Sequence, residues 1–199
     1  MISVTRPGSL IGVRLQRLVG DLATDCRGIA ATEFAFIVPL MLVMFFGTVE
    51  FCSGIAVQRK VTLMARTLSD LTSQSTSVND FTNTFAASNG IMYPYPTSPL
   101  NSTITELYVD PKTMQARVQW SVGSAPHAQS STVGIPAALL VAGTYLIFSE
   151  VNYKYVPTVG YVMAQTGVTL GDVSYTRPRQ SSCVFYTPVD GTTTTCPSR

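Results

Sequence analysis

The sequence predicts an α+β protein in which a long N-terminal helix, whose first half spans a membrane, precedes a small antiparallel β-sheet head. Three observations support this fold class. Sixteen residues, from Phe34 to Val49, carry no charge. Charged residues make up 12% of the 199 residues and hydrophobic residues 46%, which is lean in charge for a chain wholly in water. The second half of the chain alternates apolar and polar residues, as strands do. One domain with an anchor fits this length.

The N-terminal apolar run is long enough for a transmembrane helix. From Ile29 to Val57 the only charged residues are Glu33 and Glu50. A membrane span needs about 20 mostly apolar residues at about 1.5 Å of rise each, so we expect residues 29–57 to form it. A buried core helix is the alternative, but no other segment supplies the amphipathic elements that would surround it. Glu50 lies about one span's length from Ile29, so we expect it to be solvated at the membrane interface.

The charge of residues 1–28 predicts the orientation of that helix. This leader carries a net charge of +2, from Arg6, Arg14, Arg17 and Arg27 against Asp21 and Asp25. Positively charged flanks stay in the cytoplasm, so we expect a cytoplasmic N terminus and an exported C-terminal head. The basic residues at positions 59, 60 and 66 weaken this asymmetry without reversing it.

Residues 58–90 are predicted to form an amphipathic helix followed by a short second helix, outside the membrane. Apolar residues recur at spacings of three and four, at Val57, Val61, Met64, Leu68 and Leu71. We expect this stripe to pack on the head, with contact to neighbouring subunits as the alternative. Ser77 and Asp80 resemble a helix capping box, and Val78, Phe81 and Phe85 follow at helical spacing before Asn89-Gly90.

Residues 91–199 are predicted to form the β-rich head. Three prolines within residues 93–99 exclude a helix there. Strands are expected at 103–109 and 114–122, joined by a turn at 110–112, and further strands at 145–155 and 168–176. In the second strand the alternation predicts one apolar face, made by Met114, Ala116, Val118, Trp120 and Val122. In the third it predicts a face with Tyr145, Ile147, Val151, Tyr153 and Tyr155.

Two features of the head bear on topology. Residues 133–148 carry no charge, so a second membrane span is the alternative to a single pass; Gly134, Pro136 and Gly143 interrupt this run and favour the single pass. Cys183 and Cys196 lie in a polar, Thr-rich tail, and we expect them to form a disulfide if the head is exported to an oxidising compartment.

The segment "RGIAATEFAFIVPLMLVMFFGTVEF", residues 27–51, resembles the N termini of type IV prepilins and, more closely, the TadE/TadG-like pseudopilins (minor pilins) of Tad, or Flp, tight-adherence pilus systems. The resemblance implies a pilin-like fold and cleavage by a prepilin peptidase between Gly28 and Ile29. It places Glu33 fifth in the mature chain, and Phe34 and Pro39 in the segment through which subunits assemble. It also implies as partners the prepilin peptidase, other pilin or pseudopilin subunits and the Tad assembly machinery, at the bacterial inner membrane.

Glu33 and Pro39 are unusual residues for a membrane helix. A carboxylate in hydrocarbon costs several kcal/mol unless it is paired, so Glu33 is a functional candidate, with the new α-amine as its natural partner in pilins. A solvated position at the cytoplasmic headgroups is the alternative. Pro39 removes one backbone hydrogen bond, which predicts either a plain kink or a site where the helix melts locally on extraction into a filament.

Enzyme chemistry has no support in the sequence. His127 is the sole histidine, and no acids or cysteines lie near it in sequence to complete a metal site. No nucleophile elbow, phosphate loop or basic domain is present, so we expect no enzyme activity, no cofactor, no metal and no nucleic-acid partner. Three hypotheses stand: a cleaved pseudopilin, an uncleaved signal-anchored envelope scaffold, and a surface-binding adhesion module.

Overall fold

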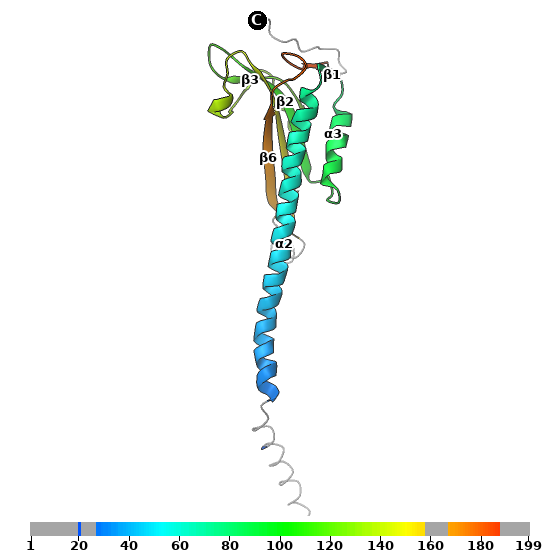
Figure 1. Cartoon of the computed structure of the whole chain (residues 1–199), viewed down its shortest axis with the longest axis vertical. Helices are drawn as coiled ribbons and strands as arrows, with labels where there is room; N and C mark the ends of the chain where they lie inside the picture. The colour runs from blue at the N-terminus through cyan, green and yellow to red at the C-terminus, as the bar shows by residue number, and fades with distance from the viewer. Residues whose placement is uncertain (1–19, 21–26, 158–166, 188–199) are drawn as a thin grey trace, which may run out of the picture. The chain divides into compact units, whose positions relative to one another are not determined.

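A computed structural model describes residues 20, 27–157 and 167–187 (Figure 1). Its long helix is α2 (Arg27–Ser73), and a short helix, α3 (Thr82–Asn89), runs into the 3₁₀ turn η1 (Gly90–Met92). Five strands form the main sheet: β2 (Leu100–Val109), β3 (Ala116–Gly123), β4 (Thr132–Val133), β5 (Tyr145–Tyr155) and β6 (Val168–Thr176). A further 3₁₀ turn, η2 (Ala137–Leu139), lies between β4 and β5. Two short strands complete the head, β1 (Ser77–Val78) and β7 (Phe185–Tyr186). The predicted fold class is confirmed: a long apolar N-terminal helix precedes an α+β head.

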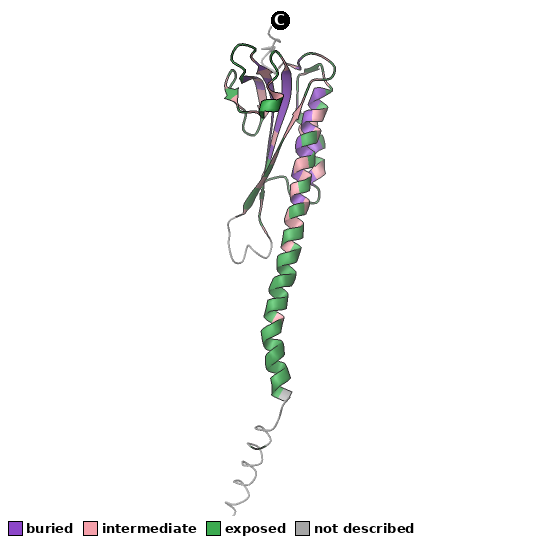
Figure 2. Ribbon diagram, turned by 60° about the vertical axis from the view of Figure 1, so that its left-hand side comes forward, coloured by how far each residue is buried: buried purple, intermediate pink, exposed green. Residues whose placement is uncertain are grey.

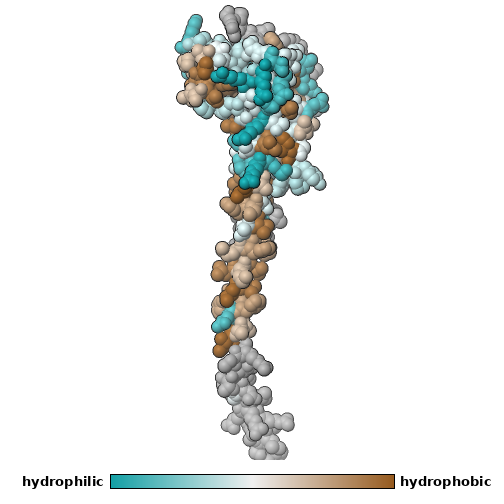
Figure 3. All heavy atoms as spheres, in the orientation of Figure 1, coloured by the Kyte–Doolittle hydropathy of each residue, from teal (hydrophilic) through white to brown (hydrophobic). Residues whose placement is uncertain are grey.

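The chain divides into two compact units, Met1–Val49 and Glu50–Arg199, and α2 contributes residues to both. In the first unit the described residues are Gly20 and the part of α2 up to Val49, most of whose large apolar side chains are exposed (Figures 2 and 3). α2 contains an 18-residue stretch with a mean hydropathy of 2.2, none of it buried within the protein. Within the described residues it is the helix long and apolar enough to cross a membrane, and it fits a single-pass anchor.

The second unit is built on a five-stranded antiparallel sheet with strand order β4-β3-β2-β5-β6. The predicted pairing of 103–109 with 114–122 is confirmed, since Val109 pairs with Ala116 and Thr105 with Ser121. Asp110 stabilises the turn by accepting a hydrogen bond from the Lys112 N–H at 2.8 Å. β6 has the bounds that the sequence predicts for the last strand, residues 168–176. A separate parallel pair, β1 with β7, joins distant parts of the chain.

The prediction of one apolar face for β3 is wrong. The register between β2 and β3 shifts between Glu106 and Leu107, so Trp120 pairs with Glu106 but Val118 pairs with Leu107. Such a bulge reverses the side-chain alternation. Trp120 and Val122 therefore pack in one core, with α2, and Ala116 and Val118 in a second core. Met114 lies outside the strand, with a φ of 52°. In β5 the alternation holds: Ile147, Val151 and Tyr153 are buried in the α2 core, and Leu146 and Phe148 in the other.

α2 packs one face on the sheet along its C-terminal half (Figure 2). Val57, Val61, Met64 and Leu68 are fully buried there, as predicted, but Leu71 is 37% exposed. At 100° per residue the buried arc is centred on small side chains, Ala65, Ser69 and Thr72, and Leu71 lies at its edge. Small residues let the helix approach the sheet closely, which apolar spacing alone does not reveal.

Polar side chains link this face of α2 to β5 and β6; we call these contacts the polar seam. Ser149 Oγ donates to the Ala65 carbonyl at 2.5 Å, and Ser69 Oγ donates to Ser174 Oγ at 2.9 Å. Nearer the N terminus of α2, Gln58 Nε2 donates to the Gly171 carbonyl at 3.1 Å, and Thr62 Oγ1 donates to the Asp172 carboxylate. The seam satisfies polar groups that would otherwise be buried without partners.

The segment after α2 differs from its prediction. Ser77 and Val78 form β1 and pair with β7, so the expected capping box does not form. Asp80 instead accepts hydrogen bonds from the N–H and Oγ1 of Thr82 at the start of α3. The strand pairing with residues about a hundred positions later overrides the local capping pattern, although the short helix itself is confirmed.

The second-span alternative for residues 133–148 is wrong. The segment contains the end of β4, the 3₁₀ turn η2 and the first residues of β5, and no α-helix. Val133, Ile135, Leu139 and Leu140 cover the second core, which explains their apolar character.

Candidate processing and assembly site

The predicted processing residues lie in the first turns of α2. Gly28, Ile29, Glu33 and Phe34 are all exposed. A Cβ added at Gly28 would meet no atom within 4 Å, so packing does not require a glycine there. Thr32 donates to the Ile29 carbonyl at 2.8 Å, a local contact that leaves the side chains of Ile29 and Glu33 unobstructed.

Ile29 and Glu33 are four residues apart on this helix, so they lie on the same face, about 6 Å apart along the axis. An α-amine at Ile29 would therefore be within reach of the Glu33 carboxylate on its own helix. A neighbouring helix shifted by about one turn would present its own amine equally well. The arrangement suits charge pairing and not bond-making chemistry.

α2 continues through Pro39 without ending. Proline has no N–H to donate to the carbonyl four residues earlier, which is that of Ala35. One i to i−4 hydrogen bond is therefore missing from the apolar part of α2, where both Pro39 and Ala35 are exposed.

Glu50 is not simply solvated, contrary to the expectation. It is half-buried and accepts a hydrogen bond from the Tyr155 hydroxyl at 3.0 Å. Burial, followed by Glu50 itself, raises the pKa of Tyr155, so the phenol stays protonated as the donor. The contact joins the first charged residue after the apolar run to the end of β5.

Tyr155→Phe should lower the free energy of unfolding by about 1 kcal/mol, because it removes this hydrogen bond and leaves the ring. Tyr93→Phe is the matched control, since Tyr93 is 81% exposed, and it should change stability little. Chemical denaturation of the full chain in detergent, followed by Trp120 fluorescence, measures both. Equal effects of the two substitutions would contradict the role assigned to Tyr155.

The predicted disulfide stays a prediction, because Cys196 lies outside the described residues. Cys183 is buried beside Val184 in the second unit. Residues 188–199, which hold most of the Thr-rich tail, also lie outside the described residues.

His127 has a partner that the sequence did not suggest. Its Nε2 lies 2.5 Å from Glu150 Oε2, and its backbone N–H donates to Ser121 Oγ at 3.0 Å. Both side chains are partly exposed, that of Glu150 on β5 and that of His127 in the loop after β3. Within residues 27–157 and 167–187, no three histidine, cysteine or acidic side chains gather as metal ligands would.

Glu106 is a buried acidic residue that the sequence analysis did not single out as a candidate. It is 2% exposed, inside β2. Its Oε1 accepts a hydrogen bond from the Val184 N–H at 2.6 Å, and Trp120 Nε1 donates to the Val184 carbonyl at 2.9 Å. The two side chains thus hold both polar groups of the Val184 backbone, next to β7. The sequence signal that could have revealed it is a single acidic residue within the predicted strand 103–109.

The surroundings of Glu106 favour its neutral form. Burial raises the pKa of Glu106 to about 8, and the hydrogen bond from Val184 opposes that rise. Burial, followed by the nearness of Glu106, raises the pKa of Tyr145 to about 12. The Tyr145 hydroxyl is buried and has no hydrogen-bond partner among the described residues. A neutral carboxyl group is thus the form that this apolar site accommodates.

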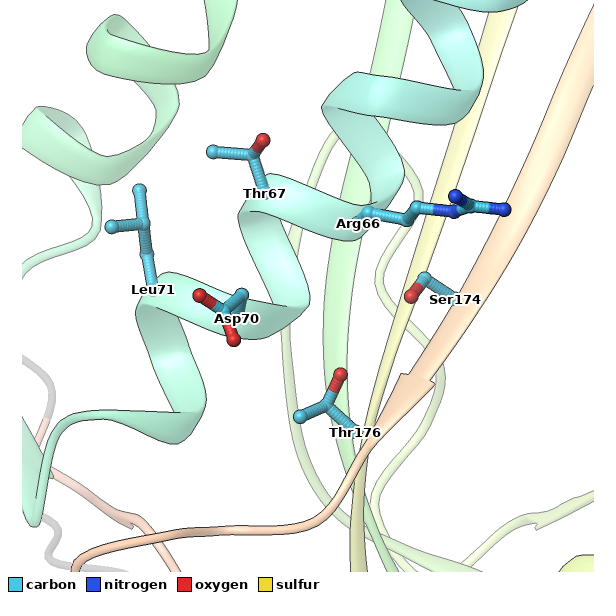
Figure 4. A pocket seen from close by; sticks show the side chains of 6 residues that line it. All are labelled: Arg66, Thr67, Asp70, Leu71, Ser174 and Thr176. Carbon is cyan, nitrogen blue, oxygen red and sulfur yellow. The ribbon is translucent and has the colours of Figure 1, made fainter.

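An open hollow lies where the polar seam ends, lined by Arg66, Thr67, Asp70, Leu71, Ser174 and Thr176 (Figure 4). Figure 4 shows Ser174 and Thr176 on β6 opposite Arg66 and Asp70 on α2, with Leu71 turned away from β6. Asp70 pairs with Arg179 at 2.5 Å, and both side chains are well exposed. The hollow holds no arrangement suited to catalysis.

The described residues thus define an α+β class of protein, in which a long apolar helix that fits a single-pass membrane anchor precedes an antiparallel sheet. The family model described as TadE-like protein matches residues 28–69, so the resemblance expected for this segment is confirmed and supports an association with Tad pili. The match covers α2 from Gly28 almost to its end. Searches of the curated proteins and of the solved structures gave no match.

Proposed function

We propose that this chain is a TadE-like minor pilin, or pseudopilin, that takes part in Tad pilus assembly and surface adherence. A prepilin peptidase cuts after Gly28, and the mature chain begins at Ile29. The protein performs no catalysis and needs no cofactor; it acts through contacts with other pilin or pseudopilin subunits and with the assembly machinery.

The observation that carries this proposal is the register of Gly28 and Glu33 at the start of the matched segment, residues 28–69. Cleavage there makes Glu33 the fifth residue, on the same helical face as the new α-amine of Ile29. An ion pair between them removes most of the cost of a carboxylate at the edge of the hydrocarbon. Phe34 and Pro39 then belong to the helix surface that meets neighbouring subunits.

The proposed topology is a single pass through the bacterial inner membrane. Residues 1–28 are the cytoplasmic leader, 29–57 the span, 58–90 the exported amphipathic and short helices, and 91–199 the exported head. Four arginines in the leader support this orientation. An exported head would also let Cys183 and Cys196 form a disulfide.

Mass spectrometry of the protein from its own cells, with and without the prepilin peptidase, tests the cleavage. We expect a chain starting at Ile29 only when the peptidase is present. Gly28→Val should abolish this product, although the added side chain has room in α2; Gly47→Val, where a Cβ likewise meets nothing, is the matched control. An intact N terminus in both strains would instead identify an uncleaved anchored scaffold.

Glu33→Gln tests the role of the carboxylate separately. Cleavage should be unchanged, but the amount of protein assembled with pilus components should fall at least several-fold, because the neutral side chain cannot pair with the amine. Thr32→Ala, one residue earlier and equally exposed, should leave assembly intact. Normal assembly of Glu33→Gln would remove the pairing role.

A further inference from the structure

The end of β5 is attached to α2 where the apolar run stops. The Tyr155 hydroxyl bonds to Glu50, and a Cβ on Gly54 would lie 3.9 Å from the Tyr155 ring. Glu50 follows the last residue of the uncharged run, Val49. Tyr155 therefore marks the part of the head that lies level with the exit of α2 from its apolar stretch.

A second contact, independent of Tyr155, places the start of β6 at the same position along the axis of α2. Gly171 accepts a hydrogen bond from Gln58, and Val168 is three residues nearer the start of the strand. Three strand residues span about 10 Å, which equals about six to seven residues of helix. Val168 therefore lies near the level of Phe51, consistent with its pairing with Tyr155 in the sheet.

Apolar side chains are exposed at this level on both α2 and the sheet. They are Phe51 and Ile55 on α2, and Val156 and Val168 at the ends of β5 and β6. With Tyr155 we call them the juxtamembrane patch. Tyrosine with exposed aliphatic residues is the composition that proteins place at the membrane–water interface.

Basic residues border the patch. Arg59 and Lys154 are exposed, one on α2 and the other beside Tyr155 on β5. The acid at this level, Glu50, is half-buried and bonded to Tyr155. An exposed basic rim around an apolar patch complements anionic lipid headgroups, because each lysine or arginine near the membrane surface is attracted to their negative charge.

We propose that the juxtamembrane patch is a second membrane-contacting surface, which rests on the lipid headgroups of the leaflet from which α2 emerges. This inference rests on the proposed membrane span of α2. The patch enters the interface no deeper than the upper acyl chains, as amphipathic surface elements do, within about 10 Å. It holds the head against the bilayer before the protein leaves the membrane.

Tryptophan quenching in the full chain tests the proposal. The protein is reconstituted in vesicles of phosphatidylethanolamine and phosphatidylglycerol, with bromine placed near the headgroup end or near the methyl end of the acyl chains. Val168→Trp is compared with Val173→Trp, five residues farther along β6, because the two valines are similarly exposed, at 54% and 48%. Native Trp120 is buried in the head and supplies the baseline.

The emission added by Val168→Trp should shift to the blue and be quenched several-fold more by bromine near the headgroups than near the methyl ends. Val173→Trp should resemble the Trp120 baseline. Phe45→Trp reports the anchor and should be quenched by the deep bromine. Quenching at Phe45→Trp without any at Val168→Trp would overturn the lipid contact alone; no quenching at Phe45→Trp would overturn the membrane span with it.

Discussion

Replacing Glu106 by glutamine should remove most of the dependence of the head's stability on pH between about 5 and 9. Glutamine keeps the shape of the side chain and an oxygen to accept the hydrogen bond from Val184. It lacks the charge that this buried position disfavours. The variant and the wild type should therefore be similarly stable at the acid end of this range, and the variant more stable at the alkaline end.

The sign follows from the two pKa values. The pKa of Glu106 is about 8 in the folded chain against an ordinary value of 4.5. Below the ordinary value the carboxyl is neutral in both states and costs nothing. As the pH rises through the interval, the unfolded chain ionises first, so stability falls until the pH passes the folded pKa. The full difference is on the order of 5 kcal/mol.

Denaturant unfolding in detergent at several pH values measures this effect, and Trp120 reports it because it pairs with Glu106 in the sheet. The quantity to compare is the difference in unfolding free energy between the two proteins at each pH, which cancels all other titrating groups. Parallel curves for both proteins would show that Glu106 is ionised in the folded head.

Leu68→Ala should lower the free energy of unfolding by about 2 to 5 kcal/mol, while Leu71→Ala should lower it by less than about 1 kcal/mol. Leu68 is fully buried between α2 and the sheet, so its removal leaves a cavity in the core. Leu71, one turn later, is 37% exposed at the edge of the hollow. The two substitutions are chemically identical and change helix propensity equally.

Their comparison tests which face of α2 is buried. Unfolding midpoints and slopes of both variants, measured by the same fluorescence signal, give the two free energies. If Leu71→Ala is as destabilising as Leu68→Ala, the helix packs on the apolar stripe that the sequence suggests. A smaller effect of Leu71→Ala supports the rotated face centred on Ala65 and Ser69.

The strands and the long helix could be predicted from the sequence because each has a strong periodic pattern. The bulge beside Glu106 could not, since Ala116, Val118 and Trp120 alternate in the same way with or without it. Only the pairing with β2 decides which core receives each side chain. The same limit applies to β1, whose partner lies at the far end of the chain.

The small-residue face of α2 was hidden for a different reason. Hydrophobic spacing weights large apolar side chains, whereas Ala65, Ser69 and Thr72 are buried because they permit close approach and hydrogen bonds. Among site residues, Gly28 and Glu33 were visible through their register in a recognisable segment. Glu106 and the Tyr155–Glu50 contact depend on tertiary neighbours, so sequence alone did not single them out.

The polar seam has a mechanical consequence. Its bonds from Gln58, Thr62 and Ser69 are spread along the axis of α2, and their partners follow in the same order along β6. Tension applied along this axis would strain all of them together, in shear. Peeling the helix sideways from the sheet would instead break them one after another. The head is thus built to resist traction along its own helix better than it resists leverage across it.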